Sequence, residues 1–130
     1  MEAPYHRVVR IDETRLERLG AISRHIFFSP SLTGNKHIKF AYVSMDPGTV
    51  SPPHRHIGDE AIYTLSGIGE CRLEGKTYLL EKDTAFVIPP GKTHPVKVVS
   101  KEPWAAIGAY CDECPMLKEY IAMKGKLELK

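Results

Sequence analysis

The sequence has little of what marks a membrane, secreted or nucleic-acid-binding protein. Its 18 basic residues are nearly balanced by 16 acidic ones, so there is no electrostatic footprint for a nucleic acid or a membrane surface. No apolar run approaches the roughly 20 residues of a transmembrane helix. Residues 1–10 have neither the apolar core nor the small-residue cleavage site of a signal peptide. We therefore expect a cytoplasmic protein.

Cysteine is also scarce, and three cysteines argue against a disulfide framework, which would use an even number at higher density. We expect Cys71 to be packed in the middle of a strand. Cys111 and Cys114 have the spacing of half a zinc site or a redox pair, but a lone C-x-x-C is weak evidence. The alternative is that Cys111 ends the last strand and that Asp112 or Cys114 begins a helix over Pro115 to Met123.

Repeats, low-complexity tracts and linkers are absent, and 130 residues fit a single domain covering residues 1–130. Short apolar segments separated by turn residues predict an all-β body, a sandwich or barrel. A helix from Asp12 through Leu16 and Leu19 to Gly20 is expected in the N-terminal appendage, after a short strand over residues 8–11. The expected strands of the body are 26–29, 38–45, 60–65, 69–73, 77–80, 85–88, 96–99 and 104–110, with a C-terminal helix over 115–123.

Two histidines and a glutamate lie at offsets that suit a metal site. Alternate side chains of an extended chain point the same way, so His54 and His56 project together while Arg55 turns away. Glu60 lies an even number of residues further on and can return to the same interior. His94 follows a proline-glycine turn and opens a second strand that could face the first.

Three imidazoles and one carboxylate suit iron, manganese, nickel, copper or zinc, and do not suit calcium or magnesium. These four ligands leave coordination positions for water or substrate, which is typical of a reactive site. The other histidines, His6, His25 and His37, have no partner at ligand spacing and are expected to be surface or structural residues.

These residues resemble the cupin family, whose first motif is G-x5-H-x-H-x3-E-x6-G. Gly48, His54, His56, Glu60 and Gly67 occupy every fixed position of it. The resemblance implies a cupin-type antiparallel β-barrel, a jelly-roll-like double-stranded β-helix. Its core covers about residues 37–110, with an N-terminal appendage over 1–30 and a tail over 111–130, each with a short helical segment.

The second cupin motif, G-x5-P-x-G-x2-H-x3-N, is matched by Pro89, Gly91 and His94. It departs at Asp83, which replaces the opening glycine, and at Val98, which replaces the closing asparagine. Neither departure removes a ligand, because Asp tolerates turn conformations that glycine usually takes and Val98 costs at most a polar contact. The resemblance implies that His54, His56, Glu60 and His94 bind a divalent transition metal.

Strand parity predicts which residues line the pocket. Ile62 and Thr64 share the face of Glu60, Val96 and Val98 share that of His94, and parity brings no Arg or Lys inward. A sugar-phosphate isomerase would need such a cation, so an apolar pocket favours a small organic substrate and oxygen chemistry. Further lining residues are expected from Phe86 and Ile88 and from one of two alternating pairs, either Val43 and Met45 or Phe40 and Tyr42.

The leading hypothesis is therefore a metal-dependent dioxygenase-type enzyme, favoured over an isomerase or decarboxylase, in which Glu60 can also act as a base. The alternatives are a small-molecule binding protein without catalysis and a metal-dependent isomerase or epimerase, since the cupin fold does not choose a reaction. Open strand edges and the family resemblance predict a homodimer.

Overall fold

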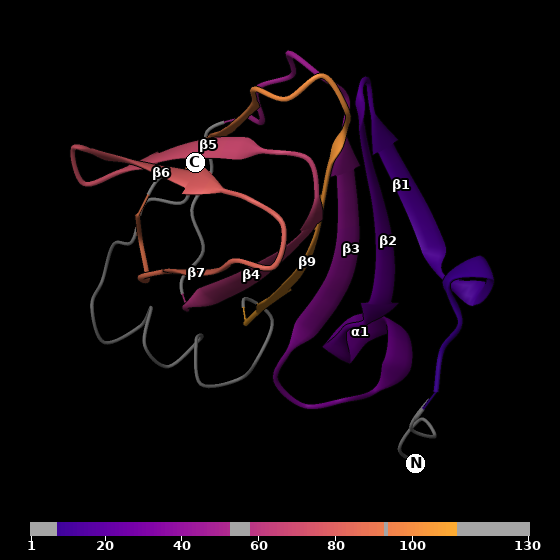
Figure 1. Cartoon of the computed structure of the whole chain (residues 1–130). Helices are drawn as coiled ribbons and strands as arrows, with labels where there is room; N and C mark the ends of the chain where they lie inside the picture. Colours follow the sequence, from indigo (N-terminus) through magenta and orange to yellow (C-terminus); the bar gives the residue numbers. More distant parts are fainter. Residues whose placement is uncertain (1–7, 53–57, 93, 112–130) are drawn as a thin grey trace.

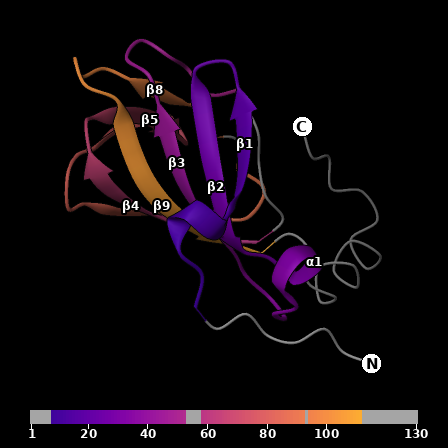
Figure 2. The same cartoon turned by 90° about the vertical axis from the view of Figure 1, so that its right-hand side faces the viewer.

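The computed structural model describes residues 8–52, 58–92 and 94–111, and the account below concerns these residues. They form two antiparallel sheets. The six-stranded sheet has the order β1-β2-β3-β9-β4-β7 and the three-stranded sheet the order β6-β5-β8. Figure 2 shows β1, β2, β3 and β9 side by side, with β5 and β8 behind them. The strands are β1 (Arg15–Leu19), β2 (Ile22–Phe28), β3 (Lys39–Met45), β4 (Glu60–Ser66), β5 (Gly69–Leu73), β6 (Lys76–Leu80), β7 (Ala85–Ile88), β8 (Val96–Val98) and β9 (Trp104–Tyr110).

The body agrees with the sequence-based prediction, since each strand expected between residues 38 and 110 is present within a residue or two. The all-β class is confirmed, but the predicted closed barrel is not seen among the described strands, which form two separate sheets. The segment before residue 52 extends the smaller sheet, because the backbones of Gly48, Thr49 and Ser51 bond to Val96 and Val98 of β8.

The predicted N-terminal helix over residues 12–20 is wrong, and so is the predicted strand over residues 8–11. Residues Ile11–Glu13 form a single 3-10 turn (η1), and the next five residues form β1. β1 pairs with β2 along its whole length, from Arg15 opposite Ile26 to Leu19 opposite Ile22. Gly20 turns the chain between them with a φ of +57°, so long-range pairing overrode a locally helical pattern.

The only α-helix among the described residues is the four-residue α1 (Pro30–Thr33). Ser29 caps its N-terminus by accepting from the Leu32 backbone N–H at 3.1 Å. The C-terminal helix predicted for 115–123 lies outside the described residues. No helix in the described part of the chain is long and apolar enough to cross a membrane.

The core residues come from both sheets, and Figure 1 shows β5 and β6 of the smaller sheet apart from β3 and β9 of the larger one. Cys71 is fully buried there, which confirms its predicted packed position. Val98 is also buried, so the residue that replaces the motif asparagine belongs to the core. The core cluster comprises Met45, Ile62, Cys71, Leu73, Leu80, Ile88, Val96, Val98, Trp104 and Ala106.

Several motif positions have a left-handed backbone, and Gly67 and Asp83 show why their residue types fit. Gly67 has a φ of +72°, and a Cβ there would lie 2.2 Å from the Pro103 carbonyl oxygen, so only glycine fits. Asp83 has a φ of +63°, which confirms that Asp takes the turn conformation of the missing glycine. The Tyr63 hydroxyl donates to its carboxylate at 2.8 Å, which helps to hold that turn.

Candidate metal site and pocket

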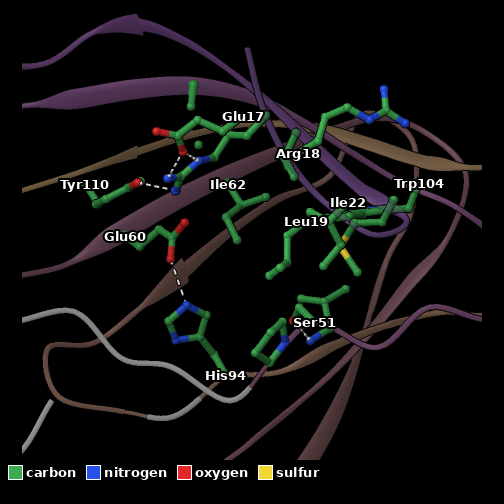
Figure 3. Close-up of a pocket in the computed structure, with 17 residues that line it drawn as sticks. Glu17, Arg18, Leu19, Ile22, Ser51, Glu60, Ile62, His94, Trp104 and Tyr110 are labelled. Carbon is green, nitrogen blue, oxygen red and sulfur yellow. Dashed lines mark hydrogen bonds and ion pairs between the residues drawn. The ribbon is translucent and has the colours of Figure 1, made fainter. Parts of the chain in front are cut away.

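A cavity of about 440 Å³ lies against the inner face of the six-stranded sheet and reaches β8. Its size suits a small ligand. The polar residues of the cavity come from several elements, and Figure 3 shows Glu17, Tyr110 and Glu60 on one side with His94 facing Glu60. Most of the remaining wall is apolar and is formed by Leu19, Ile22, Ala41, Val43, Met45, Ile62, Val96 and Trp104.

Strand parity predicted part of this lining correctly. Ile62 and Val96 face the cavity, and of the two alternatives on β3 it is Val43 and Met45 that line it. Thr64, buried on the same face of β4, accepts a hydrogen bond from the Trp104 indole at 3.2 Å.

Glu60 and His94 point toward each other across the cavity. Glu60 is the first residue of β4, and His94 lies two residues before β8. The His94 Nε2 atom lies 2.9 Å from the Glu60 Oε1 atom, and the two side chains are only 3% and 12% exposed. Two sequence-distant residues with metal-binding side chains thus meet in a buried position (Figure 3).

The orientation of the His94 ring follows from its other nitrogen. Nδ1 lies 2.9 Å from the Lys92 carbonyl oxygen, and because a carbonyl only accepts, we assign the proton to Nδ1. In the neutral ring, Nε2 then presents a lone pair toward a carboxylate oxygen. A lone pair beside a carboxylate oxygen suits the binding of a cation, and a backbone carbonyl that fixes the ring is typical of metal-binding histidines.

Ser51 connects the first motif to the strand that follows His94. Its backbone N–H donates to the Val96 carbonyl at 2.8 Å, and its Oγ accepts from the Val96 N–H at 2.8 Å in a buried position. These two hydrogen bonds to Val96 fix the chain before His54 against the start of β8. The two motifs that supply the predicted ligands are therefore tied together near the cavity.

Two neighbouring residues bear on the proposed ligands: Gly108 leaves room for the Glu60 carboxylate, and Cys71 is a possible further ligand that its pKa argues against. A Cβ on Gly108 of β9 would lie 3.3 Å from Glu60 Oε2, so the absence of a side chain there keeps the carboxylate uncrowded. Burial, and second the negative charge of Glu60, raises the pKa of the Cys71 thiol to about 11. Because metals bind the thiolate, this protonated thiol is unsuited to be a further ligand.

One wall of the cavity is charged, and the expectation of a pocket without an inward cation is wrong. Arg24 of β2 lines the cavity and forms an ion pair with Glu17 of β1, with Nε 3.1 Å from Glu17 Oε1. Its Nη1 donates to the Tyr110 hydroxyl of β9 at 2.9 Å. The hydrogen bond from Arg24 holds the pKa of the Glu17 carboxyl below its usual range.

The sequence-based prediction missed Arg24 because residues 12–20 were assigned to a helix and the following strand to start only at residue 26. The alternation of Ile22, Arg24 and Ile26 was the signal available, since it places Arg24 on the face of two apolar residues. Arg18 of β1 also borders the cavity.

Of the four predicted ligands, the structure brings Glu60 and His94 together, whereas His54 and His56 lie outside the described residues, as do Arg55 and His6. Within residues 8–52, 58–92 and 94–111 no group of three metal-binding side chains occurs. His25 contacts the Thr14 hydroxyl at 2.8 Å and His37 is exposed, in agreement with structural and surface roles.

Comparison with known proteins supports the resemblance. A family model described as "Cupin domain" matches residues 41–109, more than half of the chain. No curated protein matches the chain significantly.

Solved structures share the fold. The polyketide cyclase RemF from Streptomyces resistomycificus has a TM-score of 0.71 and 19% identity, over 84% of this chain and 81% of that one. KdgF from Halomonas sp. has a TM-score of 0.63 and 24% identity, over 77% of this chain and 90% of that one. Bacillus subtilis oxalate decarboxylase, described with Mn(II) centres, has a TM-score of 0.76 and 22% identity, over 87% of this chain and 32% of that one. At these identities the similarity shows the fold alone.

Proposed function

We propose that this chain, which belongs to the cupin family, binds a divalent transition metal through His54, His56, Glu60 and His94 and acts as an enzyme on a small organic molecule. The observation that carries the proposal is the buried approach of His94 Nε2 to Glu60 Oε1 at 2.9 Å. A ring nitrogen held as a lone-pair donor beside a carboxylate is a suitable pair of metal ligands.

The ligand set suits iron, manganese, nickel, copper or zinc. The Mn(II) centres described for the oxalate decarboxylase of the same fold support a divalent metal in this chain. A bound redox-active ion would supply the electron transfer that dioxygen chemistry needs. The residues of the chain would orient the substrate, exclude water with the apolar wall, and accept a proton at Glu60.

An oxygenase is the reaction class we favour. Arg24 does face the cavity, but its guanidinium is shared with Glu17 in an ion pair, so this site suits a singly charged group that exchanges with one carboxylate better than a doubly charged phosphate. The rest of the cavity is mainly apolar, which suits a small organic substrate. Such a cavity next to open metal positions favours oxygenation over sugar-phosphate isomerisation.

A Lewis-acid reaction is the second candidate. Arg24 and Tyr110 supply polar donors beside Glu60, and donors of this kind can stabilise negative charge on a carbonyl oxygen during isomerisation or cyclisation. The fold shared with a polyketide cyclase is compatible with this candidate. Binding without catalysis is the remaining alternative.

Metal content tests the proposal directly. The protein would be purified without chelators or an affinity tag and compared with His94→Ala and with His37→Ala, whose histidine is exposed and away from the cavity. We expect near-stoichiometric metal in the wild type and in His37→Ala, and loss of most of it in His94→Ala. No metal in any sample, even after reconstitution, would sink the metalloenzyme proposal.

The reaction class is then separated by dioxygen consumption with a panel of small aromatic and ketonic compounds. Iron, manganese, copper or nickel with substrate-dependent oxygen uptake supports the oxygenase. Zinc, or turnover without oxygen uptake, supports the Lewis-acid reaction. A compound that binds unchanged, and still binds after the metal is removed, supports a binding protein.

We also propose a homodimer. β1 and β7 are the edges of the six-stranded sheet, and Leu19 of β1 and Val87 of β7 are 65% and 61% exposed. Unpaired edges with exposed apolar side chains favour pairing with a second chain. Light scattering at micromolar concentration measures this, and a monomer would refute it.

A further inference from the structure

Three residues of the cavity wall, Glu17, Arg24 and Tyr110, lie outside the segment 41–109 that matches the cupin family. We call them the charged wall. They come from β1, β2 and β9, and all three line the cavity. The family match therefore does not account for the chemistry of the charged wall, which is a property of this chain.

The strand register explains how the charged wall reaches Glu60. Arg24 stands opposite Glu17 on one side and Val43 on the other, whereas Tyr110 stands opposite Glu60. Between these two sets of paired residues, Ala41 of β3 pairs with Gly108 of β9. Both residues are small, which leaves space for the long Arg24 side chain. The guanidinium crosses this pair and its Nη1 donates to the Tyr110 hydroxyl at 2.9 Å.

Two residues of the charged wall, Arg24 and Glu17, are open to a ligand, whereas Tyr110 is buried beside them. The Arg24 and Glu17 side chains are 36% and 39% exposed, whereas the His94 and Glu60 side chains are 3% and 12% exposed. A guanidinium has a planar fork of N–H donors that matches a carboxylate and can serve several oxygen acceptors at once. A ligand carboxylate would thus compete with Glu17 for the same cation.

We propose that Arg24, with Tyr110 beside it, determines specificity by binding the carboxylate of a small organic acid whose remaining body is apolar. Because Tyr110 is the cross-strand neighbour of Glu60, the atoms next to that carboxylate lie close to Glu60 and His94. The apolar body packs on Val43, Met45 and Ile62. The proposal deepens the proposed function and rests on it for the assumption that the ligand reacts at Glu60 and His94.

The test measures affinities for matched carboxylates and amides by calorimetry, using benzoate and benzamide, cyclohexanecarboxylate and its amide, and hexanoate and its amide. We expect the wild type to prefer at least one carboxylate over its amide by about tenfold or more, because a hydrogen bond to a charged group has this strength. Arg24→Gln should abolish the preference. Arg72→Gln, an exposed residue of β5 away from the cavity, should keep it.

A second variant, Glu17→Gln, should change the carboxylate affinity in the opposite direction to Arg24→Gln. Glu17→Gln removes the carboxylate that competes for Arg24, so carboxylate affinity should rise by about threefold or more. A purely structural role of the ion pair would not raise affinity. This variant also keeps the test decisive should Arg24→Gln fail to fold. The proposal is overturned if no compound in the panel binds, if carboxylate and amide bind equally, or if Glu17→Gln leaves the affinity unchanged.

Repeating the measurements after chelation separates this proposal from the metal proposal. An Arg24-dependent preference that persists without metal supports the carboxylate site, even if no metal is ever found in the protein. A preference that disappears on chelation and survives Arg24→Gln in the metal-loaded protein assigns carboxylate binding to the metal and overturns the role of Arg24.

Discussion

The same cavity holds two close side-chain pairs of different character. Glu60 and His94 are almost wholly buried, whereas Glu17 and Arg24 are each more than a third exposed. A buried charge must be matched by a partner or an ion, because the desolvation penalty is large. An exposed pair is screened by water and contributes little to stability. One end of the cavity thus suits a bound cation, while the other can exchange its partner.

The two pairs also differ in how they are supported. His94 is fixed by the Lys92 carbonyl, and the chain before the first motif is fixed by Ser51 on Val96. The Arg24 guanidinium is held by two long side chains, Glu17 and Tyr110. We infer that the buried end provides a preorganised reaction centre and the charged wall provides selection, which the following changes would test.

The largest difference is expected between Glu60→Gln and Glu17→Gln in metal affinity. Removing a proposed ligand should weaken metal binding by roughly 100-fold or more, since removing even a residue behind a ligand costs about 10–100-fold. Glu17→Gln should change it by less than about twofold. A competition titration with a chromophoric chelator measures both. Equal losses in the two variants would show that the buried pair has no special role.

Ser51→Ala should have the next largest effect. The buried Val96 N–H loses its acceptor, which should lower the free energy of unfolding by about 1–3 kcal/mol. Urea denaturation measures it, with Ser44→Ala as the control because Ser44 lies on the opposite face of β3 from Val43 and Met45. Metal affinity should fall as well, and an unchanged stability would contradict the role of Ser51.

A smaller effect is expected from Tyr110→Phe, which removes the hydroxyl that accepts from Arg24. The guanidinium loses one of its supports, so the preference for carboxylate over amide should fall by about threefold to tenfold. Metal content should stay at the wild-type level. A preference as large as that of the wild type would exclude Tyr110 from ligand selection.

The smallest effect concerns pH. Because Arg24 lowers the pKa of Glu17 in the folded protein, the pair stabilises the fold above the usual value of 4.5 and loses this contribution as pH falls through the lowered pKa. The wild type should exceed Glu17→Gln by less than about 1 kcal/mol at pH 7. In urea denaturation the difference should shrink as the pH is lowered below 4.5, and a gap that widens at acid pH would contradict this assignment.

The body of the fold was predictable because its signals are local and agree with one another. Alternating apolar residues and glycine turns marked the strands from Lys39 to Tyr110, and two motifs marked Glu60 and His94. The N-terminus was not predictable in the same way. The spacing of Leu16 and Leu19 also fits a helix, and only pairing of β1 with β2 settled the strand.

By itself, the sequence determined the cupin family, the strand-rich body and the residues proposed as ligands, because motif spacing and side-chain alternation are properties of the chain alone. Tertiary structure decided that His94 Nε2 meets Glu60 Oε1 and that Arg24 enters the cavity. Both depend on register between strands far apart in sequence, where a shift of one residue would turn every side chain to the other face.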